Sequence, residues 1–140
     1  MISELVIIVD DDPVCRAYLS ALVEKMGYSV LQLSDAANLT FSCSYFSHVK
    51  ALLLDMNMPK LDGYRAAKKI RKLDRRKLGF DHLPIIAVSG IEGNQEKCFK
   101  VGCDVYLKKP VSYGELLNAF IQVGLVENKG QFVESSNSSA

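Results

Sequence analysis

The sequence predicts a single α/β domain built on a doubly wound, five-stranded parallel sheet with five helices. Along the chain, short apolar runs typical of buried parallel strands alternate with segments in which apolar residues recur at helical spacing. This alternation favours right-handed crossovers that leave helices on both faces of the sheet. Two apolar runs stop on carboxylates, 6–9 on Asp10 and 49–54 on Asp55, and open α/β sheets place their ligands at such strand ends.

The first half of the chain contains recognisable helix boundaries. Asp12 suits an N-cap, the proline after it suits a first helical turn, and Gly27 ends the apolar periodicity. A second helix, over 38–47, is the weakest prediction because Ser, Thr and aromatic residues there have low helix propensity. The elements expected here are a strand over 6–9, a helix over 13–26, a strand over 28–33 and a helix over 38–47.

The second half repeats the strand–helix pattern. Gly102 ends one helix, and Ser112 with Glu115 forms a capping box at the start of the last one. The polar, serine-rich end of the chain favours a domain over 1–126 and a flexible tail over 127–140. The expected elements are strands over 51–54, 84–88 and 105–108, and helices over 64–74, over 94–101 and after Ser112.

Bulk composition excludes several classes of protein. The chain has 140 residues, 49% of them hydrophobic, and its net charge of +1 gives no reason to expect nucleic acid or a membrane surface as partner. Its longest apolar runs are too short to span a membrane, and its start lacks the basic region of a signal peptide. The cysteines lack zinc-site spacing, so we expect free thiols and a cytoplasmic or nuclear location. They are Cys15, Cys43, Cys98 and Cys103.

The carboxylates at the strand ends predict a metal site. In a flavodoxin-like strand order, the first and third strands are neighbours at the switch point of the sheet. Asp10, Asp11 and Asp55 then come together, and carboxylates this close need a cation to remain ionised. An all-oxygen cluster suits Mg²⁺.

The fourth and fifth strands add two more polar groups at the same edge. The fourth ends on Ser89 and the fifth is followed by Lys109, so a hydroxyl and an ammonium join the carboxylates. This set suits phosphoryl transfer onto Asp55, with the cations neutralising charge on the transferring group.

Over 5–123 the chain resembles the receiver domains of two-component response regulators. Four motifs carry the resemblance: Val-Asp-Asp-Asp-Pro at 9–13, Asp-Met-Asn-Met-Pro-Lys-Leu-Asp-Gly at 55–63, Ser89, and Lys-Pro at 109–110. The long connection over 74–83 is similar to that of receivers attached to eukaryotic hybrid kinases. Ser-Gly at 89–90 and Lys-Pro-Val-Ser at 109–112 resemble receivers of plant ethylene-receptor-type kinases.

The resemblance implies a function in a His-to-Asp phosphorelay. Asp55 would be the phosphoacceptor, taking phosphate from a phosphohistidine on a histidine kinase or a histidine phosphotransfer protein. Asp11 would bind Mg²⁺ directly and Asp10 largely through water, while the backbone carbonyl of Asn57 would complete the protein ligands. Such a domain is not a general enzyme and assists only its own phosphorylation and dephosphorylation.

The resemblance also implies a two-state switch. Ser89 and Lys109 would contact the phosphoryl group, and inward movement of Ser89 would make room for Tyr106 to rotate. The peptide bond between Lys109 and Pro110 would be cis. The loop after Ser89 is about two residues shorter than in many members of the family, so Tyr106 is equally well read as a fixed core aromatic.

Two other functions remain open from the sequence. One is a receiver-like module that docks partner proteins without being phosphorylated. The other is a Mg²⁺-dependent phosphatase, which is disfavoured because Asn57 stands where such enzymes usually carry a second acid. A run of basic residues forms either a solvated helix face or a docking surface. The run consists of Lys68, Lys69, Arg71, Lys72, Arg75, Arg76 and Lys77.

Overall fold

The computed structural model describes residues 4–36, 48–57, 63–72 and 82–127. The strands are β1 (Leu5–Val9), β2 (Ser29–Leu33), β3 (Val49–Asp55), β4 (Ile85–Ser89) and β5 (Val105–Lys108). The helices are α1 (Pro13–Lys25), α3 (Gly63–Lys72), α5 (Gln95–Lys100) and α6 (Tyr113–Gln122). Within these ranges no helix is both long and apolar enough to span a membrane.

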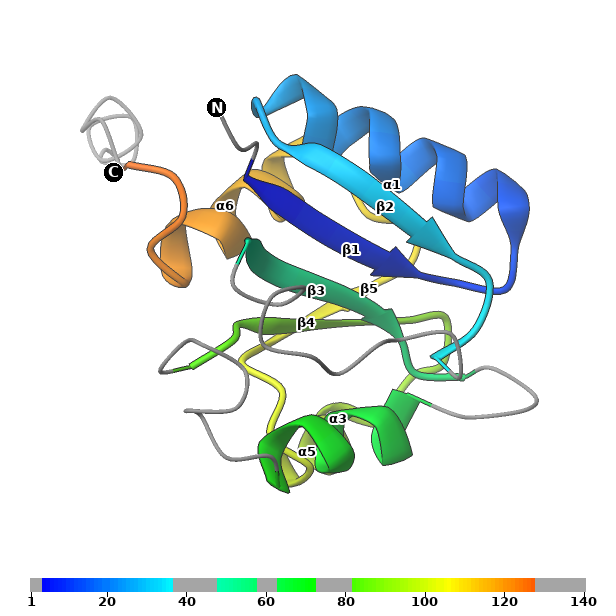
Figure 1. Cartoon of the computed structure of the whole chain (residues 1–140). Coiled ribbons are helices and arrows are strands. Elements are labelled where there is room, and N and C mark those ends of the chain that lie inside the picture. The colour runs from blue at the N-terminus through cyan, green and yellow to red at the C-terminus, as the bar shows by residue number, and fades with distance from the viewer. Residues whose placement is uncertain (1–3, 37–47, 58–62, 73–81, 128–140) are drawn as a thin grey trace, which may run out of the picture.

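The strands form one parallel sheet in the order β2-β1-β3-β4-β5, which confirms the expected flavodoxin-like topology. Helices α1 and α6 cover one face of the sheet, and α3 and α5 cover the other (Figure 1). Four helices lie among the described residues, whereas five were expected. The expected helix over 38–47 and nearly all of the expected tail over 127–140 lie outside the described residues, so both stay predictions.

The predicted helix boundaries at α1 and α6 are confirmed by hydrogen bonds. The carboxylate of Asp12 accepts from the backbone N–H of Val14 at 3.0 Å, and a proline stands at the first position of α1. Ser112 and Glu115 form a reciprocal capping box at the start of α6, at 3.1 and 2.9 Å. Gly27 follows α1 with a φ of 98°, a conformation that glycine adopts without steric cost.

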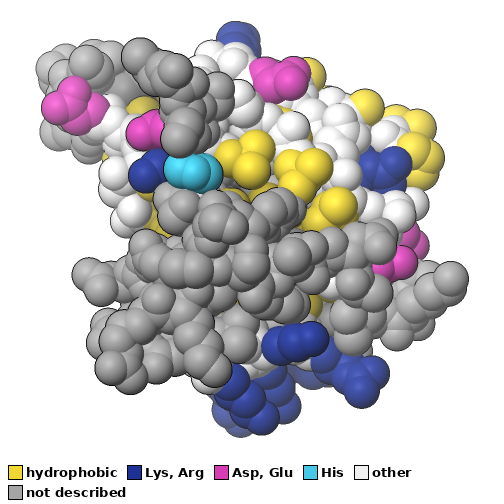
Figure 2. All heavy atoms as spheres, viewed as in Figure 1, with side chains coloured by type: hydrophobic (Ala, Val, Ile, Leu, Met, Phe, Trp, Pro, Cys, Tyr) yellow, Lys and Arg dark blue, Asp and Glu magenta, His cyan; other side chains and the backbone are white. Residues whose placement is uncertain are grey.

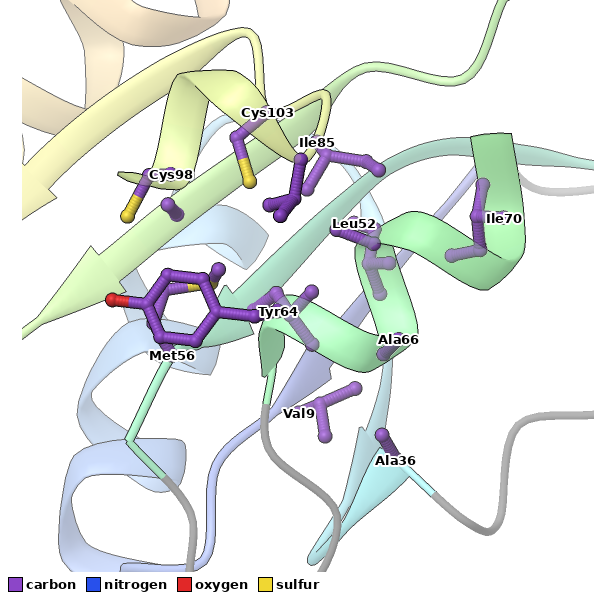
Figure 3. Close-up of a cluster of buried hydrophobic side chains, with 14 of the residues drawn as sticks. Val9, Ala36, Leu52, Met56, Tyr64, Ala66, Ile70, Ile85, Cys98 and Cys103 are labelled. Atoms are coloured by element: carbon purple, nitrogen blue, oxygen red, sulfur yellow. The ribbon is translucent and has the colours of Figure 1, made fainter. Parts of the chain in front are cut away.

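The sheet divides the apolar core into two layers. Successive residues of β1 point to opposite faces, as strand geometry requires: Ile7 and Val9 lie on the α3 side, whereas Val6 and Ile8 lie on the α1 side. Figure 3 shows the α3 side, where Tyr64 and neighbouring apolar side chains pack against the sheet. Because both layers consist of buried apolar side chains packed against the sheet, the strand ends that carry polar groups are held in place.

A network of polar contacts joins the amino ends of β4 and β5. The carboxylate of Asp104 pairs with Arg71 at 2.9 Å and with His82 at 2.8 Å, and it accepts from the backbone N–H of Ile85 at 2.8 Å. Arg71 also donates through Nε to the carbonyl of Gly102 at 2.9 Å. The interpretation of Arg71 as part of a solvated basic face was therefore wrong, because sequence spacing does not reveal an acid 33 residues away.

The other described members of the basic run lie on the surface. Lys68, Lys69 and Lys72 are exposed on α3, together with Arg65. In Figure 2, Lys and Arg side chains gather at the lower edge of the molecule, over the position of α3 and α5 in Figure 1. This placement fits both earlier interpretations, a solvated helix face and a docking surface.

Candidate active site

Three carboxylates meet at the carboxyl edge of the sheet. Asp10 and Asp11 follow β1, and Asp55 ends β3; because Val9 pairs with Leu54 in adjacent strands, the acids after them are neighbours. Each of the three offers an oxygen, and these oxygens lie within 4.8 Å of one another. Asp10 and Asp55 are buried, at 1% and 5% exposure, while Asp11 is exposed. The sequence therefore predicted this grouping correctly.

Asp55 is held in an environment that disfavours its charge. Burial, followed by the charges of Asp10 and Asp11, raises the pKa of Asp55 from 3.8 to about 6. The backbone N–H of Asn57, which donates to Asp55 Oδ1 at 3.1 Å, and the charge of Lys109 act in the opposite direction. A carboxylate in this setting becomes easier to ionise when a cation joins the cluster.

Lys109 reaches the same cluster from the end of β5. Its Nζ lies 2.9 Å from Asp10 Oδ2 and 3.7 Å from Asp55 Oδ2. Burial alone would lower the pKa of Lys109, but the close contact with Asp10 and the charge of Asp55 outweigh it and raise the pKa. The backbone N–H of Lys109 donates to the carbonyl of Ser89 at 2.8 Å, and the Lys109–Pro110 peptide is cis, as expected.

Ser89 ends β4 with its side chain fully buried and hydrogen-bonded. Its hydroxyl donates to Asn57 Oδ1 at 2.9 Å and accepts from the backbone N–H of Ile91 at 3.1 Å and from Asn94 Nδ2 at 3.0 Å. Asn94 Nδ2 also donates to the hydroxyl of Tyr64 at 2.7 Å. The Asn57 side chain, Asn94 and Tyr64 carry no sequence signal for this role, since three separate parts of the fold bring them together.

Tyr106 lies on β5, next to β4, where it pairs with Ala87. It is half-buried, packs against the α3 side of the core, and donates its hydroxyl hydrogen to the carbonyl of Ile91 at 3.0 Å. Ser89 and Tyr106 therefore contact the same residue of the loop between them. A role for Tyr106 as a switch stays a prediction.

An apolar groove lies beside Lys109. Its volume is about 620 Å³, and Val14 and Tyr18 on its rim are 75% and 46% exposed. The hydroxyl of Tyr18 donates to the carbonyl of Val111 at 2.6 Å, which joins α1 to the segment after β5. The groove is lined by Asp12, Val14, Cys15, Tyr18, Leu19, Lys109, Pro110 and Val111.

The thiols of the described residues show no sign of reactivity. Cys15, Cys98 and Cys103 are free, as expected. Burial raises the pKa of Cys15 to about 11 and that of Cys103 to about 12, and it also raises the pKa of Cys98. These thiols therefore remain protonated at neutral pH.

Comparison with known proteins connects this geometry to a family. The sequence model of the response regulator receiver domain matches residues 6–121. Response regulator Rre1 of Synechocystis sp. is 35% identical over 114 residues, which cover 79% of this chain and 47% of Rre1. The chain spans less than half the length of the first curated relatives that it matches.

Solved structures agree with this match. The receiver domain of the histidine kinase CKI1 from Arabidopsis thaliana, crystallised with Mg²⁺ and BeF₃⁻, has a TM-score of 0.72 at 27% identity over 86% of this chain and 89% of that one. The Ssk1 receiver domain of Saccharomyces cerevisiae, in a complex with the histidine phosphotransfer protein Ypd1, has a TM-score of 0.70 at 21% identity over 89% and 92%. Since the family match covers more than half of the sequence and the strand order agrees with it, this chain belongs to the response regulator receiver domains of two-component systems.

Proposed function

We propose that this receiver accepts a phosphoryl group on Asp55 from a phosphohistidine of a histidine kinase or a histidine phosphotransfer protein. One observation carries the proposal: Asp55 is a buried carboxylate that lies within reach of two further acids and of the Lys109 ammonium. A nucleophilic carboxylate needs nearby cations to offset the charge of the incoming phosphoryl group. No other described cluster of acids meets the same distance requirement.

Mg²⁺ fits the donor set at this edge. Asp10 Oδ2 is buried and forms an ion pair with Lys109, but it makes no hydrogen bond of good geometry among the described residues. This oxygen can therefore still coordinate a metal ion. Oxygen ligands from carboxylates and carbonyls are those that Mg²⁺ prefers. Asp10, Asp11, Asp55 and the backbone carbonyl of Asn57 would hold the ion. When bound, Mg²⁺ supplies positive charge opposite the transferring phosphoryl oxygens.

The transfer itself needs one bond formed and one broken. A carboxylate oxygen of Asp55 forms a bond to phosphorus, the phosphorus–nitrogen bond of phosphohistidine breaks, and its electron pair returns to the imidazole nitrogen. Lys109 neutralises charge on the phosphoryl oxygens, and the hydroxyl of Ser89 donates to one of them. Hydrolysis of the resulting acyl phosphate regenerates Asp55, so the domain assists only its own phosphorylation and dephosphorylation.

The donor protein would lie on the groove next to Lys109. A phosphohistidine must be brought within bonding distance of Asp55, and the exposed apolar side chains of Val14 and Tyr18 border the same edge. An exposed apolar patch bordered by polar groups is typical of protein–protein contacts. The phosphorylated state would then change partner binding through Ser89 and Tyr106.

Intact mass spectrometry tests the proposal. The chain is incubated with Mg²⁺ and phosphoramidate, beside Asp55→Asn and the matched control Asp12→Asn, whose side chain caps α1. We expect a single phosphate on wild type and on Asp12→Asn, and none on Asp55→Asn or in EDTA. An equal adduct on Asp55→Asn would contradict the assignment. No adduct on wild type, together with no response to beryllofluoride, would favour a docking module that is not phosphorylated.

A further inference from the structure

We infer that Asn94 is a positioning residue that holds the Ser89 hydroxyl in its resting place, and that Tyr64 in turn holds Asn94. This inference deepens the proposed function and rests on it, because Ser89 is there the hydroxyl that contacts the phosphoryl group. It concerns a contact at the start of α5 that is strained when Ser89 moves toward the phosphoryl group.

The hydroxyl of Ser89 has no free hydrogen-bonding capacity in this structure. Its single hydrogen points to Asn57 Oδ1 at 2.9 Å, with the carbonyl of Ile91 farther away at 3.3 Å. Its two acceptor sites are filled by the backbone N–H of Ile91 and by Asn94 Nδ2, at 3.1 and 3.0 Å. To donate to a phosphoryl oxygen on Asp55, Ser89 must release Asn57, and any displacement also strains its bond to Asn94.

The amide of Asn94 is satisfied on one side only. Both hydrogens of Nδ2 are used, toward Ser89 Oγ and toward the hydroxyl of Tyr64 at 2.7 Å. Its Oδ1 is buried and has no hydrogen-bond partner among the described residues. A buried oxygen without a partner carries a free-energy cost, so the resting arrangement is less stable than a fully satisfied one. A contact of this kind holds Ser89 but is readily exchanged.

Tyr64 gives Asn94 a fixed support. It stands on α3, is only 8% exposed, and packs in the α3-side core with its ring beside Met56 and its hydroxyl pointing out of the cluster (Figure 3). Lys97 Nζ lies 4.0 Å from the ring centroid, which adds a second contact between α5 and this ring. Tyr64 is therefore a rigid anchor, and Asn94 connects it to Ser89 across the loop after β4.

Loss of the Asn94 side chain should shift the equilibrium toward conformations in which Ser89 reaches the phosphoryl group. One hydrogen bond of ordinary net strength changes an equilibrium constant by about two- to tenfold. We expect Asn94→Ala to tighten the apparent affinity for beryllofluoride with Mg²⁺, and to speed phosphorylation by phosphoramidate, by about this factor. Tyr64→Phe, which removes only the hydroxyl, should act in the same direction with a smaller effect.

Three controls separate positioning from general loosening. Asn118→Ala, on the exposed side of α6, should match wild type in both measurements. In a Ser89→Ala background, Asn94→Ala should have no further effect, because the residue that it positions is absent. Amide hydrogen exchange at Ile91, measured without phosphodonor, should rise in Asn94→Ala because this N–H bonds to Ser89 Oγ.

Each result decides the question. If wild type is phosphorylated but Asn94→Ala and Tyr64→Phe both match it in beryllofluoride affinity, the inference is overturned and the proposed function stands. An Asn94→Ala effect of equal size with and without Ser89 would also overturn it. Should Asn94→Ala fail to fold, Tyr64→Phe still tests the inference, through its beryllofluoride affinity and through exchange at the Ile91 amide in that variant. If wild type takes no phosphate, the proposed function fails, whereas Ile91 exchange still reports whether Asn94 holds Ser89.

Discussion

The raised pKa of Asp55 has a measurable consequence for stability. A group whose pKa is raised by folding binds its proton more tightly in the folded state, so it costs stability as the pH rises through the folded-state pKa. Asp55→Asn removes that cost and keeps an oxygen for the N–H of Asn57, which now bonds to Asp55 Oδ1 at 3.1 Å. We therefore expect Asp55→Asn to gain stability over wild type as the pH is raised, provided that no metal is present.

The size of the effect follows from the two pKa values. A pKa of about 6 in the folded chain against 3.8 for an unperturbed aspartate corresponds to about 3 kcal/mol when the group is fully ionised. From these two pKa values, proton linkage gives a cost of about 1 kcal/mol at about pH 4.5 and nearly the full cost at about pH 8. The advantage of Asp55→Asn over wild type should thus grow by about 2 kcal/mol between these two conditions.

Urea denaturation in EDTA measures this difference. The free energies of unfolding of wild type, Asp55→Asn and Asp12→Asn are compared at both pH values, and Asp12, an exposed acid that is not a member of the cluster, serves as control. Added Mg²⁺ should reverse the order at high pH, since binding to the folded wild type stabilises it by mass action. A difference between Asp55→Asn and wild type that is the same at both pH values would refute the reasoning.

Three further substitutions test other parts of the structure. Lys109→Met removes the charge that lowers the pKa of Asp55, so NMR titration in EDTA should give a value above about 6; an unchanged value would contradict the electrostatic role of Lys109. Gly63→Ala places a Cβ 2.6 Å from the carbonyl oxygen of Asp55. We therefore expect the free energy of unfolding, measured in urea, to fall by about 1–3 kcal/mol and phosphorylation by phosphoramidate to become slower. Wild-type values for both would count against this contact. Phe120→Ala empties a fully buried site beside Tyr28 (ring centroids 5.7 Å apart) and should cost about 3–5 kcal/mol of unfolding free energy; a cost below 1 kcal/mol would mean that the site collapses.

The sequence predicts the acidic edge well because the signals there are local. Each apolar strand ends at a carboxylate, and parallel pairing then brings Asp10 and Asp55 together whatever the details of the helices. The caps of α1 and α6 are predictable for the same reason, since Asp12 and Ser112 bond to residues two or three positions away. Strand bounds differ by a few residues only, as for β3, which extends from Val49 to Asp55.

The parts that escaped prediction depend on contacts between distant segments. Arg71 reads as one more cation on a basic helix until the fold brings Asp104 to it. Asn94 reads as the start of a short helix, whereas its amide bonds to Ser89 on one strand and to Tyr64 on another helix. The Arg71–Asp104 and Asn94–Tyr64 contacts join residues 33 and 30 positions apart, so no sequence periodicity marks them. The fold could therefore be derived from sequence patterns, but the hydrogen bonds that connect Ser89 to Asn94 and Tyr64 could not.

The Asp104 network gives β4 and β5 unequal ends. At their amino ends, one carboxylate binds the N–H that opens β4, the guanidinium from α3 and the imidazole of His82. Ser89 and Lys109 lie at the opposite ends of these strands, where the proposed phosphorylation changes their side-chain contacts. Sliding either strand would break the Asp104 contacts, so movement of Ser89 or Lys109 has to be taken up by bending within four or five residues. The two strands are thus fixed at their amino ends, and movement is confined to their carboxyl ends. A partner that responds to the positions of Ser89 and Lys109 must therefore bind on the carboxyl-edge half of the molecule.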